Sequence, residues 1–141
     1  MHSIELEWKK AINFKVTQDG HSFDIDGSEE FGGQDLGPRP KALLLSALAG
    51  CSGMDIVSML EKMKYQDFTF KIKVNAELNT EHPIVYTQAN ITYYFEGEKL
   101  DAKNIIKAVK LSEEKYCGVS AMLAKAFPIT SEIFVNGEKI K

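Results

Sequence analysis

An uncharged, largely apolar run over residues 42–54 is the feature that most constrains how this chain folds. Pro40 precedes the run, and proline suits the first turn of a helix because its missing N–H is not needed there. We therefore expect a helix over residues 40–64, apolar nearly all round in its first half, which must be covered on every side. A chain of 141 residues has little material for that cover. A second copy of the chain is the economical source of it.

Length and charge bound the remaining possibilities. A chain of 141 residues with 44% hydrophobic content fits one compact domain over residues 1–141. The net charge of −3 and the single arginine, Arg39, give no basic surface for phosphates or anionic lipid, so we expect neither nucleic acid nor membrane as a partner. The uncharged run is too short to cross a bilayer. The first residues lack the pattern of a secretory signal, which makes the cytoplasm the expected location.

Alternating apolar and polar residues predict strands on both sides of the long helix. Two short helices should follow the second group of strands, and Ser112 is a suitable N-cap for the second of them. The expected order is three strands, the long helix, two strands, two helices and one strand, with the strands in antiparallel runs. This order favours an α+β fold over a doubly wound parallel sheet. The strands are expected over residues 4–8, 12–16, 23–25, 68–76, 84–95 and 129–135.

The chain's only two cysteines, Cys51 in the apolar run and Cys117 near the second short helix, are the residues best suited to chemistry. A thiolate attacks the O–O bond of a peroxide and becomes a sulfenic acid, which a second thiol converts to a disulfide. In a reducing compartment such a pair is more often thiols than a structural disulfide. Free cysteine is also among the most commonly buried residue types, so core packing is the alternative interpretation.

Two segments resemble the signatures of a known family. Gly-Pro-Arg-Pro-Lys-Ala-Leu-Leu-Leu-Ser-Ala-Leu-Ala-Gly-Cys51-Ser-Gly-Met-Asp-Ile-Val resembles the long-helix signature of the OsmC/Ohr family, and Leu-Ser-Glu-Glu-Lys-Tyr-Cys117-Gly-Val-Ser-Ala-Met-Leu resembles its second-cysteine signature. The similarity is greatest to the YhfA-like branch. It implies an OsmC-like α+β fold in which antiparallel sheets wrap around a long central helix in an intertwined homodimer, with the cysteines at the subunit interface.

The same resemblance implies an activity. Characterised members of the family are thiol-dependent peroxidases that reduce organic hydroperoxides and need no bound cofactor, because an external dithiol such as a lipoyl group reduces them. By resemblance, Cys51 is the peroxidatic residue and Cys117 the resolving one. An apolar pocket would favour organic peroxides over hydrogen peroxide.

The sequence departs from the family at the residues that activate the thiol. The family's peroxidases use an arginine from the early strands and a glutamate just after the proline that starts the long helix. This chain has no arginine in those strands, and Lys41 and Ala42 occupy the positions after the proline. Arg39 and Lys41 are candidate replacements for the positive charge. Asp55 lies one helical turn beyond Cys51, where its charge would oppose thiolate formation unless it holds a cation in place.

Other functions stay open at this point. A non-catalytic dimer of the same fold could bind a small apolar ligand, and a redox sensor would undergo one oxidation without recycling. We expect no metal site, because His2, His21 and His82 lie in separate segments without metal-ligand spacing and the two cysteines are distant in the sequence.

Overall fold

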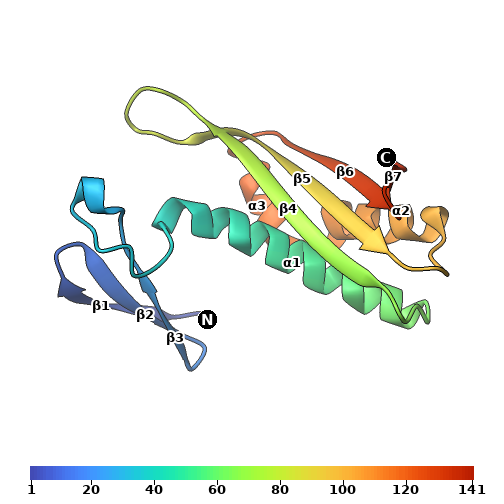
Figure 1. The fold of residues 1–141 in the computed structure, drawn as a ribbon, viewed down its shortest axis with the longest axis horizontal. Coiled ribbons are helices and arrows are strands. Elements are labelled where there is room, and N and C mark those ends of the chain that lie inside the picture. Colours follow the sequence, from blue (N-terminus) through green and yellow to red (C-terminus); the bar gives the residue numbers. More distant parts are fainter. The chain divides into compact units, whose positions relative to one another are not determined.

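The computed structural model describes residues 1–141, which form two compact units, Met1–Leu45 and Ser46–Lys141 (Figure 1). Each unit is described by itself. A single domain over the whole chain stays a prediction. The strands and the long helix that the sequence predicts are all present, so the α+β class is confirmed.

The first unit contains a three-stranded antiparallel sheet in the order β1-β2-β3. Its strands are β1 (Ile4–Lys10), β2 (Asn13–Gln18) and β3 (His21–Ile25), followed by a short 3₁₀ turn, η1 (Glu29–Phe31). The β2–β3 hairpin turns at Asp19 and Gly20, whose φ angles of 51° and 76° are those that a tight hairpin turn requires. Trp8 is 63% exposed, and every residue of β1 is exposed.

Asp26 organises the glycine-rich loop that follows this sheet. Its carboxylate accepts hydrogen bonds from the backbone N–H groups of Gly27 (2.8 Å), Gln34 (3.1 Å) and Leu36 (3.3 Å). Burial acts to raise the pKa of Asp26, but these hydrogen bonds and the charge of Arg39 outweigh it and hold the pKa below its ordinary value. The loop is therefore tied to one ionised side chain.

The long helix α1 (Pro40–Lys62) begins at the predicted proline. Only one stripe of it is buried, formed by Leu48, Ser52, Ile56 and Leu60 at successive i, i+4 positions. The opposite side carries exposed apolar side chains, including Met54 at 78% and Val57 at 36%. The uncharged run over residues 42–54 is by itself too short for a bilayer, but the whole helix of 23 residues is long and apolar enough to span one. Length and composition alone are weak evidence, since core helices of soluble proteins share them.

The second unit contains a four-stranded sheet in the order β4-β5-β6-β7. Its strands are β4 (Thr69–Leu78), β5 (Tyr86–Glu96), β6 (Ile129–Val135) and the short β7 (Glu138–Lys139). β4 and β5 form the predicted antiparallel hairpin, but β6 runs parallel to β5, which departs from the antiparallel pattern expected from the sequence. The helical segment between β5 and β6 is the crossover that a parallel pair requires.

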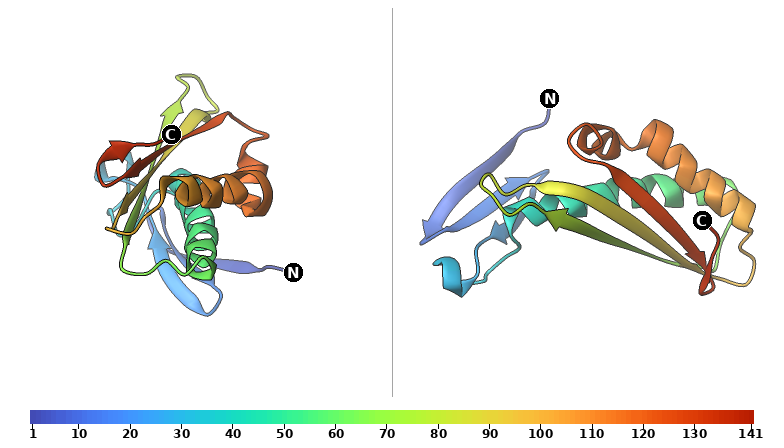
Figure 2. Two further views of the ribbon diagram at one scale, coloured as in Figure 1. Left: turned by 90° about the vertical axis from the view of Figure 1, so that its right-hand side faces the viewer. Right: turned by 90° about the horizontal axis from the view of Figure 1, so that it is seen from above.

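That crossover comprises α2 (Ala102–Leu111), a π-helical turn η2 (Ser112–Tyr116) and α3 (Gly118–Leu123). α2 lies beside α1 on one face of the sheet (Figure 2). The core lies between these helices and the sheet. Its fully buried side chains come from α1, β5, α2 and β6, and include Leu48, Ile56, Leu60, Ile91, Tyr93, Phe95, Ile105, Ala108, Val109 and Ile133.

The prediction that Ser112 caps a new helix is wrong. Ser112 has helical angles (φ −61°, ψ −51°) because α2 continues directly into η2. The N–H of Cys117 donates to the carbonyl of Ser112 at 2.8 Å, which closes the wide π-type turn. Cys117 itself is the N-cap of α3.

Candidate functional site

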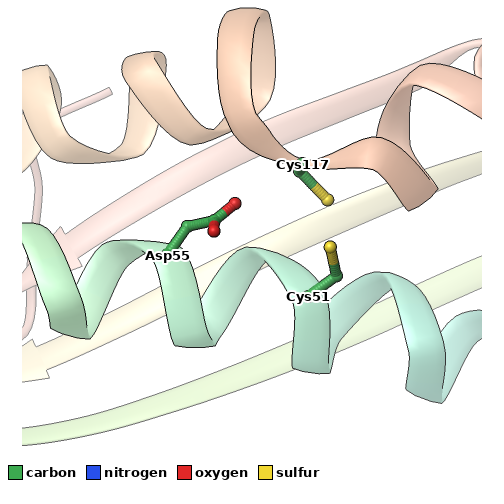
Figure 3. Close-up of side chains that lie close together, drawn as sticks. All are labelled: Cys51, Asp55 and Cys117. Carbon is green, nitrogen blue, oxygen red and sulfur yellow. The ribbon is translucent and has the colours of Figure 1, made fainter.

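Three potential ligand groups converge in the second unit. The sulfur atoms of Cys51 and Cys117 and a carboxylate oxygen of Asp55 all lie within 4.8 Å of one another. Cys51 and Asp55 project from α1, and Cys117 approaches from the junction of η2 and α3 (Figure 3). The structure therefore brings together two cysteines that are distant in the sequence, as the resemblance implied.

Local structure explains how each side chain reaches the cluster. Cys51 and Asp55 are four residues apart on α1, which places them on the same side of the helix. Cys117 has extended backbone angles (φ −74°, ψ 99°), which break the helical path between η2 and α3. The two sulfur atoms point toward each other in Figure 3. No disulfide joins them, and both cysteines are free thiols.

The Cys117 sulfur is enclosed by hydrogen-bond donors. It accepts from the N–H of Ser120 at 3.3 Å and from the hydroxyl of Ser52 at 3.4 Å. Cys117 is only 2% exposed, and its burial raises the pKa of its thiol above the ordinary value, although the two donors act in the opposite direction. Cys117 is therefore a buried, protonated thiol at neutral pH, whereas Cys51 is partly exposed.

The Asp55 carboxylate is held from the crossover. The hydroxyl of Ser112 donates to Asp55 Oδ2 at 3.2 Å, and Ser112 is fully buried. No lysine, arginine or histidine nitrogen lies within 4.0 Å of the carboxylate. Asp55 is thus oriented by a neutral donor and has no cation to balance its charge.

Two further polar groups, which the sequence reasoning missed, lie beside Cys117. The Tyr93 hydroxyl and one carboxylate oxygen of Glu113 are buried without a hydrogen-bond partner. Burial raises the pKa of Tyr93, and the charge of Glu113 raises it further. The other Glu113 oxygen forms an ion pair with Lys141 at 3.6 Å. Tyr93 lies on β5 at a position that alternation alone assigns to the core, so only the fold reveals its place in the site.

A cavity of about 310 Å³ reaches the cluster at Asp55. Its walls also include the apolar side chains of Met59 and Leu111, the ring of Tyr116 and the polar side chains of Ser58 and Lys62. Small molecules from solvent therefore have a route to the carboxylate side of the site.

The two cationic residues proposed from sequence, Arg39 and Lys41, belong to the first unit. Arg39 forms an ion pair with Asp35 at 2.7 Å and donates to the carbonyl of Gly37 at 2.9 Å. Lys41 is exposed at the second position of α1. Their role as activating charges stays a prediction.

The fold and the paired thiols agree with comparisons to known proteins. The model of the OsmC-like protein family matches residues 32–132, and the chain therefore belongs to that family. Membership of that family supports a soluble protein.

Individual relatives extend this similarity over almost the whole chain. The chain is 33% identical over 126 residues to Protein YhfA of Escherichia coli K12, covering 89% of this chain and 91% of that one. A hypothetical protein from Aquifex aeolicus VF5 superposes with a TM-score of 0.85 at 29% identity, covering 96% of each chain. The organic hydroperoxide resistance protein OhrB of Bacillus subtilis shares the fold at 16% identity, with a TM-score of 0.63 over 95% of this chain and 98% of that one.

Proposed function

We propose that this protein is a thiol-dependent peroxidase that reduces organic hydroperoxides through Cys51 and Cys117 and so protects against oxidative stress. The observation that carries the proposal is the approach of the two sulfur atoms to within 4.8 Å, from elements distant in the sequence. OsmC-like family membership and a structural neighbour named for organic hydroperoxide resistance support the same chemistry.

The proposed cycle has three balanced steps. The Cys51 thiolate attacks one oxygen of R–O–O–H, and the O–O bond breaks to give Cys51–SOH and, after protonation, R–OH. The Cys117 thiol then displaces water from the sulfenic acid and forms the Cys51–Cys117 disulfide. An external dithiol, such as a lipoyl group, reduces that disulfide and becomes a disulfide itself.

Burial supports the order of the two cysteines. Cys51 is partly exposed, so a peroxide has access to its sulfur, whereas Cys117 is 2% exposed and its thiol pKa is raised by burial. A buried protonated thiol is a poor first nucleophile. It is well placed to resolve a neighbouring sulfenic acid, because the two sulfur atoms need only close to about 2 Å to bond.

The exposed apolar surfaces support a homodimer. β1 exposes Ile4, Leu6 and Trp8, and α1 exposes Met54 on the side opposite its buried stripe. Monomeric soluble proteins seldom expose such apolar groupings unless another molecule covers them. We propose that a second copy covers α1, that an apolar hydroperoxide binds near the thiols, and that the protein works in the cytoplasm.

Stopped-flow consumption of cumene hydroperoxide and hydrogen peroxide by the reduced protein tests the proposal, with intact mass recorded on the product. We expect rapid, organic-selective consumption and a loss of about two mass units, because one disulfide forms and two hydrogens leave. Slow reaction with both peroxides and an unchanged mass would refute the peroxidase.

One observation favours a second candidate function, a dimer that senses oxidation or binds a small apolar ligand without turnover. No lysine, arginine or histidine nitrogen lies within 4.0 Å of the Asp55 carboxylate, so no cation at this carboxylate is available to activate a peroxidatic thiol. Such a sensor would be oxidised once by peroxide and would not be recycled by added dithiols. A multiple-turnover assay with a dithiol reductant separates the two functions.

A further inference from the structure

The cluster of Cys51, Asp55 and Cys117 has a property that the peroxidase cycle does not use. It places two thiols and a carboxylate within 4.8 Å of one another, with no cationic side chain at the carboxylate. Ionising both thiols beside Asp55 would gather three negative charges, which repel unless a cation lies among them. The distance between the cysteines in the sequence, which argued against a metal site, does not apply in the fold.

The donor set and its spacing suit zinc. Thiolate sulfur and carboxylate oxygen are both ordinary Zn²⁺ ligands, with Zn–S bonds of about 2.3 Å and Zn–O bonds of about 2.0–2.2 Å. In a tetrahedral site two sulfurs bound to one zinc lie about 3.8 Å apart. The three ligand atoms here are within 4.8 Å of one another. Small side-chain rotations that move these atoms by at most about 1 Å would therefore bring them to bonding distance of the ion.

Neighbouring donors are arranged as in the outer shell of a metal site. Ser112 orients the Asp55 carboxylate at 3.2 Å, and the Ser120 N–H and Ser52 hydroxyl donate to the Cys117 sulfur. Such outer partners fix ligand orientation and stabilise bound thiolates. The Tyr93 hydroxyl, which is buried without a hydrogen-bond partner, is a further polar group near Cys117.

We propose that the reduced protein binds one zinc ion through Cys51, Cys117 and Asp55, leaving the fourth position for water. Binding releases the two thiol protons to solvent, and the two thiolates and the carboxylate bind the ion. Three protein ligands with one open position is the arrangement of a reactive zinc site, whereas a closed structural site has four. The cavity at Asp55 gives the ion and the water a route from solvent.

Zinc binding and peroxide reduction use the same two sulfur atoms and therefore exclude each other. A bound ion occupies both thiolates, and a disulfide leaves neither sulfur able to bind the ion as a thiolate. The site does not depend on the proposed peroxidase activity. A protein that binds zinc but consumes no peroxide would keep this inference and lose the proposed function.

Titration of the reduced, metal-free protein with Co²⁺ and Zn²⁺ under anaerobic conditions tests the site. With Co²⁺ we expect sulfur-to-metal charge-transfer absorption that saturates at one ion per chain and disappears when Zn²⁺ is added. Bound Zn²⁺ should also protect both thiols from alkylation, read by intact mass, in the wild-type protein. Absence of saturable binding, or alkylation at an unchanged rate with zinc present, would overturn the proposal.

Variants assign the ligands. Cys51→Ser and Cys117→Ser should each lower zinc affinity at least 100-fold, and Asp55→Asn and Ser112→Ala about 10-fold or more. Glu61→Gln is the matched control, because Glu61 is an exposed carboxylate on the same helix. The zinc affinity of this variant should equal that of the wild type. Thermal melting by circular dichroism identifies any variant that fails to fold. The alkylation test uses the wild-type protein and therefore does not depend on the folding of any variant. Wild-type affinity in a folded Asp55→Asn variant would refute the three-ligand site.

Discussion

Ser112 donates its hydroxyl hydrogen to the carboxylate of Asp55 at 3.2 Å, and so joins the crossover to the long helix. Ser112 is fully buried and Asp55 is half-buried. A hydrogen bond to a charged acceptor is stronger than one between neutral groups. This contact fixes the carboxylate next to both thiols and couples the position of the π-helical turn to that of α1.

Replacing Ser112 with alanine should lower the free energy of unfolding by about 1–3 kcal/mol, because the half-buried carboxylate loses a donor. The expected fall in Tm is several degrees for a chain of this size. Urea denaturation of the reduced, metal-free protein measures the change. Ser58→Ala is the control, since Ser58 is an exposed serine on the same helix, and it should change stability by less than about 0.5 kcal/mol. Equal stability of the two variants would show that the Ser112–Asp55 contact contributes nothing.

The two cysteines should give different products when each is removed. Cys51→Ser should abolish oxidation by cumene hydroperoxide, because the remaining Cys117 thiol is buried. Cys117→Ser should leave a sulfenic acid on Cys51, which dimedone traps because no second thiol is available to condense with it. Mass spectrometry of peptides after dimedone treatment locates the adduct. An adduct on Cys117 in the Cys51→Ser variant would reverse the assigned roles.

Placing a charge at Met54 should weaken the proposed homodimer. Met54 is 78% exposed on the side of α1 opposite its buried stripe. Met54→Glu would therefore bury a charge at an apolar dimer interface, which disfavours dimerisation, but would change the free energy of unfolding of an isolated chain little. Sedimentation velocity should show a concentration-dependent shift from dimer toward monomer. Lys107→Glu, at an exposed position on α2, is the control and should leave the dimer unchanged. A wild-type protein that sediments as a monomer would remove the interface.

Asp26 should make the free energy of unfolding depend on pH in the acidic range. Its pKa is lower in the folded protein than its ordinary value of 3.8, because the backbone donors and Arg39 outweigh the effect of burial. The stabilisation is therefore present above pH about 4 and is lost as the pH falls through the lowered pKa. Asp26→Asn should destabilise the protein at pH 7, and its deficit relative to wild type should shrink at lower pH. Denaturation curves across this pH range measure it, with Asp19→Asn in the exposed turn as control; a deficit independent of pH would contradict the linkage.

Much of the fold is predictable because it depends on local patterns. The alternation of Ile4, Leu6 and Trp8 indicates a strand wherever its partners lie, and Pro40 marks the start of α1. The parallel pairing of β5 with β6 could not be predicted in this way, because the residue pattern of a strand does not determine which strand it pairs with. The helical crossover between them determines the direction of β6. The apolar pattern of a strand does not distinguish parallel from antiparallel pairing.

The site was predicted less completely, for a similar reason. The approach of Cys51 to Cys117 was expected from the family resemblance, since their spacing in the sequence contains no signal of contact. Ser112 was assigned to a helix cap because serine favours that position, whereas its hydroxyl instead bonds Asp55 across the fold. Tyr93 carried no signal at all, because a buried tyrosine on a strand is read as core until its neighbours are known.

The turn Ser112–Tyr116 contains one residue more than a regular helical turn would place before the same closing hydrogen bond. Removing any one of its residues would restore the regular winding and turn the residue that follows by about 100° around the helix axis. The Cys117 sulfur would then no longer point at Cys51, while the strands on either side kept their sequences. The extra residue of this turn is therefore what directs the Cys117 sulfur toward α1, so the spacing of the two thiols depends on backbone winding as well as on the cysteines themselves.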